Sequence, residues 1–263
     1  MRFSITNWRA VSPYHHSLSD WRNFLRQGSI IANETPQSPD LSFLPAMKRR
    51  RLSPLARLMF SAAWPLVEEG KNCPLIFVSH DGEVNRSLDL WQSLLHEDEV
   101  SPTSFALSVH NAVAGQWSLM RQDMSESVAL SARTNGLEIA IVEACGMLAA
   151  GHPEVLVVIA DEPLRGQYDI PAERAPFEYA LALLITSGDT WELLYQADEL
   201  LHSQSSLVLA ATPVDCVSKS SSSHYYSSAL NWIEQQISSD PNEACCWNEL
   251  TADGVWQWAR GAL

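Results

Sequence analysis

The chain has 263 residues, enough for one large domain or two small ones, and its 46% hydrophobic and 18% charged residues are typical of a folded protein. Its formal net charge of −14 excludes an ordinary nucleic-acid or anionic-membrane partner, because such surfaces repel an acidic protein. No apolar run reaches the ~18–20 residues that a membrane-spanning helix needs, so no membrane span is expected.

In chain order, the hydrophobic patterns predict alternating strands and helices. They are strand 2–11, helix 19–27, a helix from Ser53-Pro54 to about Glu69, strand 74–79, helix 85–96, helix 108–121, strand 127–132, helix 136–150, strand 154–161, a strand at 177–186 with a helix as alternative, strand 205–212 and helix 229–237. Ser53 is a typical N-cap, Pro54 suits the first helical position, and Gly70 is a stop signal. This alternation predicts an α/β fold with a largely parallel sheet.

Helix 136–150, "GLEIAIVEACGMLAA", is apolar almost all round and is interrupted mainly by Glu138 and Glu143. A helix without a polar face is buried on most sides. The pattern therefore predicts a layered fold in which this helix lies between two other layers.

The basic residues and the cysteines give information about the partners of the protein and about its cellular compartment. The basic segment from Lys48 to Arg51 precedes an apolar helical pattern and is interpreted as a solvated helix start or a contact for an acidic partner. The five cysteines are odd in number and lack CxxC spacing, which predicts a reduced, cytoplasmic protein without a disulfide framework or zinc site. The N-terminus, "MRFSITNWRAV", is typical of a strand, so no signal peptide is expected.

Motifs for cofactor chemistry are missing from the sequence. There is no GxGxxG, P-loop, HExxH or GxSxG pattern, so neither a cofactor nor a metal is expected. Ser79-His80-Asp81 has the letters of a hydrolase triad, but adjacent residues do not converge as such a triad does, and a strand end is the better interpretation. Cys145 lies inside an apolar helix without a basic neighbour, which favours a core residue over a thiolate nucleophile.

Three segments in this order carry a resemblance: "MKRRRLSPLARL", "PLIFVSHDGEVNRSLDLWQSLL" and "SPTSFALSVHNAVAGQWSL". Together they resemble the N-terminal half of β-ketoacyl synthases of the thiolase fold, and more closely the small chain-length-factor-like proteins of bacterial aryl polyene clusters. The third segment is the specific part. The resemblance covers about residues 1–187, which implies one domain over 1–263 with a synthase-like core at 1–187, a divergent portion at 188–263 and a truncated second half.

The resemblance also implies where catalytic groups would stand. An active synthase has a nucleophilic Cys just before the buried helix, whereas this chain places Arg133 or Thr134 there. Thr134 could attack in principle, but nothing nearby is recognisable as its activating base. The two catalytic histidines of the family come from the second half of the fold, which this chain is too short to complete. His202 and His224 lie in unrelated Ser-rich surroundings and are not assigned that role.

In the same fold, the segment corresponding to 105–120 lies at the dimer interface beside the mouth of the acyl pocket. The resemblance therefore implies a partner and tunnel surface with Phe105, Trp117 and Met120 as apolar contacts and Ser108, His110 and Asn111 as polar ones. The alternative left open is that His110 and Asn111 only cap a helix within the chain.

The resemblance thus implies a non-catalytic chain-length-factor-type subunit. It would pair with an active ketosynthase in a type II polyketide or fatty-acid-like system for aryl polyenes, meet the acyl carrier protein through that complex, and shape the acyl tunnel. One alternative is a degenerate acyltransferase using Thr134 or Cys145, which a mass shift after incubation with an acyl-carrier thioester would reveal. The other is a free-standing acyl-binding scaffold, which would be a stable monomer.

Overall fold

The computed structural model describes residues 1–15, 17–27, 35–97, 100–133, 135–165, 175, 177–197, 219–220, 227–240 and 242–261. Within them the strands form one eight-stranded sheet in the order β3-β2-β4-β5-β8-β7-β6, with β1 paired to β5 off this path. The strands are β1 Arg2–Val11, β2 Leu75–Ser79, β3 Ser127–Ser131, β4 Glu154–Asp161, β5 Tyr179–Ala197, β6 Lys219–Ser220, β7 Cys245–Thr251 and β8 Gly254–Arg260. The helices are α1 Leu18–Gln27, α2 Ala46–Arg49, α3 Pro54–Ala63, the 3₁₀ turn η1 Trp64–Leu66, α4 Val84–Glu97, α5 Pro102–Ala106, α6 Ala112–Arg121, α7 Gly136–Ala149 and α9 Ser228–Ser238.

The sheet is mixed, which corrects the expectation of a largely parallel one. β2 runs parallel to β3 and to β4, but β4, β1 and β8 all pair antiparallel with β5. β7 and β8 form a hairpin in the tail, where no strand was predicted. The reason lies in the connections: β2, β3 and β4 are joined through helices, whereas β7 and β8 are joined by a tight turn that can only reverse the chain.

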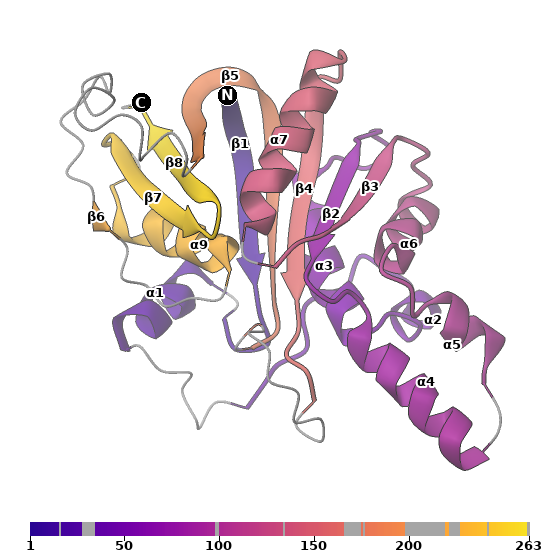
Figure 1. The fold of residues 1–263 in the computed structure, drawn as a ribbon. Helices are drawn as coiled ribbons and strands as arrows, with labels where there is room; N and C mark the ends of the chain where they lie inside the picture. The colour runs from indigo at the N-terminus through magenta and orange to yellow at the C-terminus, as the bar shows by residue number, and fades with distance from the viewer. Residues whose placement is uncertain are drawn as a thin grey trace.

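Two apolar cores cover the two faces of the sheet, as expected for strands whose side chains alternate between faces. On β2, Ile76 and Val78 face the core built with α7, while Leu75 and Phe77 face the core built with α3. Figure 1 shows α7 on the near face of the sheet and α3 behind it. The uniformly apolar runs of β2 and β4 are therefore explained by burial on both sides, as predicted.

The outer face of α7 is not covered within the described chain. Leu137, Ala140 and Ile141 point into the core, whereas Ile139 and Val142 are exposed. The predicted burial on most sides is only partial in the single chain, because the sheet covers one side of the helix and α9 and the β7–β8 hairpin contact only part of the rest. Its apolar outer face is consequently available to something else.

Several element boundaries also differ from the predicted ones. α3 begins at the predicted Ser53 cap but ends at Ala63, because Pro65 has no N–H for a further α-helical bond and the chain tightens into η1. The helix predicted from Ser108 begins only at Ala112, and α5 precedes it as a separate short helix. The strand predicted at 177–186 continues through β5 to residue 197, so the expected division after residue 187 falls inside this strand. The strand predicted at 205–212 lies outside the described residues.

Candidate functional site

The carboxyl ends of the parallel strands β2, β3 and β4 meet at one edge of the sheet, which is where α/β proteins commonly place a site. Asp161 ends β4 and is buried there. Its carboxylate accepts hydrogen bonds from the Ser79 hydroxyl at 2.9 Å and from the His80 backbone N–H at 2.7 Å. Tyr179 brings its hydroxyl to 3.1 Å from the same carboxylate. Burial raises the pKa of Asp161 to about 6, although these hydrogen bonds oppose the shift.

The segment that leaves β3 lies against this turn. The Ala132 N–H donates to the Ser79 carbonyl oxygen at 3.3 Å, and the Ser131 hydroxyl donates to the His80 carbonyl oxygen at 2.9 Å. Arg133 follows and is exposed, and α7 begins three residues later at Gly136. The predicted nucleophile position thus lies between the end of β3 and the start of a helix. Arg133 offers a cation there and no nucleophile, and Thr134 lies outside the described residues.

The free thiols of the described residues are not activated. Burial raises the pKa of Cys73 to about 12, and burial also raises the pKa of Cys145 and of Cys245 above the ordinary thiol value. A thiol with a raised pKa is a poor nucleophile near neutral pH, because little of it is thiolate. Cys246, by contrast, forms a disulfide, so the predicted absence of disulfides is wrong at that residue.

The segment that carried the resemblance divides into a surface part and an interior part. Phe105 on α5 is 64% exposed and Asn111 before α6 is also exposed. His110 is half-buried, donating from Nε2 to the Ser79 carbonyl oxygen at 3.1 Å and packing on Phe77. Ser108 is half-buried, and its hydroxyl donates to the Phe105 carbonyl oxygen at 2.8 Å. His110 therefore anchors α5 and α6 to the end of β2, and Phe105 faces outward.

Trp117 lies in the core of its own chain, with only 2% of its surface exposed. Its ring packs edge-on against Phe60 at 5.4 Å and Trp64 at 5.7 Å between centroids, and Met120 packs partly buried against the same core. The expectation that Trp117 contacts a partner directly is corrected by this burial. The physical reason is that α6 turns its Trp117 face toward α3 and the sheet, which leaves Leu119 on the outside.

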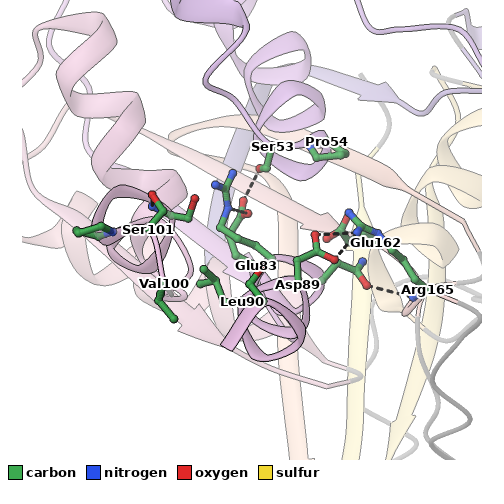
Figure 2. A pocket seen from close by; sticks show the side chains of 14 residues that line it. Ser53, Pro54, Glu83, Asp89, Leu90, Val100, Ser101, Glu162 and Arg165 are labelled. Atoms are coloured by element: carbon green, nitrogen blue, oxygen red, sulfur yellow. Dashed lines mark hydrogen bonds and ion pairs between the residues drawn. The ribbon is translucent and has the colours of Figure 1, made fainter. Parts of the chain in front are cut away.

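A pocket of about 880 Å³ opens beside this edge, between the start of α3, the start of α4 and the residues after β4 (Figure 2). Glu83 accepts hydrogen bonds from the Ser53 hydroxyl and from Arg86 Nε, and Arg165 Nη1 donates to both oxygens of Asp89 at 2.7 and 2.8 Å. Burial raises the pKa of Glu162 in this pocket to about 7. These residues were not predicted from the sequence. The adjacent acids Asp161 and Glu162, at the end of the buried strand 154–161, were a signal that could have indicated a polar site here.

The pocket is a poor site for a metal or for an apolar chain. Glu83 and Asp89 are already paired with guanidinium groups, and no cluster of three or more metal-ligating side chains occurs in the part of the chain that the structure describes. Charged walls would leave an alkyl or polyene chain in contact with groups that need water.

An open, apolar surface lies at the free edge of β3, which is the edge that does not pair with β2. β3 is the edge of the sheet, and among the described strands it pairs only with β2. The elements around it carry large apolar side chains that are exposed: Leu119 on α6, Met124 in the turn before β3, and Ile139 and Val142 on α7. Figure 1 shows β3 at the end of the sheet beside α6, while α7 lies over the neighbouring strands β4 and β2 and also touches β3. An edge strand beside exposed apolar side chains is typical of a protein interface.

The structure is an α/β protein in which a mixed sheet is covered on both faces by helices, and α7 begins shortly after the predicted nucleophile position at the end of β3. Residues 21–259 match the model of the β-ketoacyl synthase N-terminal domain, and the chain belongs to this family. The predicted thiolase-like fold is thereby confirmed.

Solved structures with this fold include ketosynthase complexes. The chain resembles one in a complex of a ketosynthase, ApeO, with its chain length factor, ApeC, from Xenorhabdus doucetiae, with TM-score 0.74 and 22% identity, covering 99% of this chain and 100% of that one. It also resembles a chain of the ishigamide ketosynthase/chain length factor, with TM-score 0.71 and 12% identity over 100% of both chains. A third structure, of the type II acyl-carrier protein AntF with its ketosynthase AntDE, gives TM-score 0.66 and 14% identity over 100% of this chain and 99% of that one. No curated protein matches the chain in sequence.

Proposed function

We propose that this chain is a chain-length-factor-type accessory subunit that pairs with an active ketosynthase in a type II polyketide or fatty-acid-like system of the aryl polyene kind. The observation that carries the proposal is the open edge of β3, flanked by exposed apolar side chains of α6 and α7. A family member of this fold with such a surface is suited to build a two-chain assembly. The ketosynthase and chain-length-factor complexes among its structural neighbours support the same choice of partner.

In this proposal the partner supplies the condensing chemistry. A ketosynthase needs a thiolate just before the helix that follows the edge strand, and of the two predicted nucleophile positions there the described one is Arg133, which is not a thiol. The alternative acyltransferase using Cys145 is disfavoured, because burial raises the pKa of that thiol. Thr134, the other candidate, lies outside the described residues.

Tunnel shaping is assigned to the surface side of α5 and not to the charged pocket. Phe105 is the large apolar side chain of α5 that is free to line a space shared with a partner. The charged pocket is unsuited to an apolar acyl chain because Glu83, Asp89 and Glu162 line it. The acyl carrier protein would meet the complex as a whole, because a subunit without its own nucleophile depends on the partner to receive the acyl group.

Membrane association has no support from the helices. In the part of the chain that the structure describes, none of the helices is both long and apolar enough to cross a bilayer.

The test is co-expression with a ketosynthase that has an intact nucleophilic Cys, followed by co-purification of surface variants. Leu119→Glu puts a charge on the proposed surface at a side chain that is 77% exposed, so the fold of the chain should survive while pairing is lost. Leu250→Glu is the matched control, because Leu250 is 79% exposed but lies on β7 at the far side of the sheet.

The proposal predicts a 1:1 complex for the wild type and the Leu250 variant, and a strongly reduced yield of complex for the Leu119 variant. A chain that runs as a monomer by light scattering with the ketosynthase present would favour the free-standing scaffold instead. Acylation of the isolated chain by an acyl-carrier thioester, seen as a mass shift, would favour the acyltransferase.

A further inference from the structure

Two glutamates with buried carboxyl oxygens meet where the β7–β8 hairpin lies against the start of α7. Glu138, in the first turn of α7, has 0% of its surface exposed. Glu249 shares the inward face of β7 with Trp247, since alternate residues of a strand face the same side. Trp256 and Trp258 are opposite them on β8, and Figure 1 shows the hairpin beside the lower end of α7 and α9. The hairpin therefore brings a second acid to the buried Glu138.

Each carboxyl group has one oxygen bonded and one oxygen without a partner. Trp258 Nε1 donates to Glu138 Oε1 at 2.8 Å, and Asn231 Nδ2 on α9 donates to Glu249 Oε2 at 3.0 Å. Glu138 Oε2 and Glu249 Oε1 are buried without a hydrogen-bond partner among the described residues. A buried carboxylate oxygen without a donor is costly, and the cost falls when that oxygen carries a proton.

The charges around the pair do not neutralise it. α9 contributes a third acid, Glu234, and β7 contributes the neutral thiol of Cys245 at its far end. The cation of β8, Arg260, is at that same far end, where it donates to Gln236 Oε1 and to the Asp240 carbonyl oxygen. Like charges with buried carboxyl oxygens and no described cation beside them oppose double ionisation.

The titration of both groups agrees with this geometry. Burial, followed by the charge of Glu138, raises the pKa of Glu249 to about 7, from an ordinary 4.5. Burial also raises the pKa of Glu138. Ser228 beside Glu138 and Trp247 beside Glu249 oppose these shifts, but neither of them reaches hydrogen-bond geometry. At least one of the two glutamates therefore holds its proton at a pH where an exposed glutamate is ionised.

We propose that Glu138 and Glu249 form a pH-sensitive carboxyl latch, which seats the β7–β8 hairpin on α7 while at least one of the pair is protonated and releases it when both are ionised. The latch acts on the first turn of α7, a few residues after the end of β3. It thus couples the seating of the C-terminal hairpin to the helix whose outer face is exposed beside the sheet edge. The latch does not depend on the identity of the partner.

The test is amide hydrogen exchange of β8 in the full chain, in the assembly in which it purifies, at pH 5.5 and pH 8.5. At each pH the wild type is compared with Glu249→Gln, so that the intrinsic pH dependence of exchange cancels. Glutamine imitates the protonated carboxyl. Glu243→Gln is the matched control, because Glu243 is an exposed acid just before β7.

The expected result is that β8 exchanges faster in the wild type than in Glu249→Gln, and that the ratio of the two rates rises about 30-fold from pH 5.5 to pH 8.5. That factor follows when Glu138 is already ionised and Glu249 is the second of the pair to ionise, with a pKa of about 7 when the hairpin is seated and 4.5 when it is released. Glu138→Gln should protect β8 at pH 8.5 in the same direction, and Glu243→Gln should exchange like the wild type.

Three results would overturn the latch. One is a ratio of wild-type to Glu249→Gln exchange that does not change between the two pH values. Another is an equal effect from Glu243→Gln, which would make the response a general charge effect. The third is failure of both glutamine variants to fold at pH 5.5, because a protonated carboxyl and an amide should be interchangeable in the seated state.

Discussion

Trp117 and Phe105 provide a sharp test of which part of the 101–119 segment is core and which part is surface. Truncating Trp117 to Ala removes a ring that is 2% exposed and that packs on Phe60 and Trp64, so it leaves a large cavity between α6 and α3. Large-to-small changes of buried aromatic residues cost about 3–5 kcal/mol of stability. The guanidinium of Arg121, 5.5 Å from the same ring, would lose its cation–π contact as well.

Phe105→Ala is the matched variant, because it removes an aromatic ring from the same segment at a site that is 64% exposed. Its effect on the stability of the chain should stay within about 0.5 kcal/mol, as for most surface substitutions. If a partner covers this ring, the variant should instead weaken association by about 2 kcal/mol and change the length of the acyl product.

The assay is urea denaturation of each variant, followed by co-purification with the ketosynthase and profiling of the products. Opposite outcomes are expected: Trp117→Ala unfolds at markedly lower urea, while Phe105→Ala keeps its midpoint. A wild-type unfolding midpoint for Trp117→Ala, combined with loss of pairing, would refute the assignment of Trp117 to the core. A Phe105→Ala chain that pairs normally and yields unchanged products would refute the surface role of α5.

Three further outcomes are expected. Burial raises the pKa of Glu162 to about 7 from an ordinary 4.5, so as the pH rises the unfolded chain releases this proton before the folded chain does. The free energy of unfolding should therefore fall as the pH rises from about 4.5 to 7. Urea titrations of Glu162→Gln should show a smaller fall, and an unchanged pH dependence would contradict the raised pKa of Glu162. Gly82→Ala should destabilise the chain by about 1–3 kcal/mol, since φ is +56° there and an added Cβ would lie 2.9 Å from His110 Cδ2; a wild-type melting temperature would argue against that packing. Cys145→Ser should leave condensation by the complex intact, as measured by product formation, and its loss in a folded variant would revive the acyltransferase hypothesis.

Local signals in the sequence determined the elements that depend on near neighbours. Ser53 and Pro54 cap and open α3 as predicted, since capping needs only the first turn of a helix. The uniformly apolar runs of β2 and β4 indicated strands covered on both faces, and the structure buries every residue of both. The motif that contains Trp117 also pointed to the β-ketoacyl synthase family, which the match over residues 21–259 confirms.

Only the tertiary structure decided which side of each element is covered. Helix α7 is apolar all round, so its sequence could not tell that Leu137 packs on the sheet while Val142 remains exposed. Trp117 and Leu119 are two residues apart on one helix, and only the placement of α3 and the sheet puts the first inside and the second outside. The proximity of Glu138 and Glu249 likewise depends on the β7–β8 hairpin, which lies far along the chain from α7. Composition and periodicity report what a segment can bury, whereas the neighbours that cover it come from contacts distant in the chain.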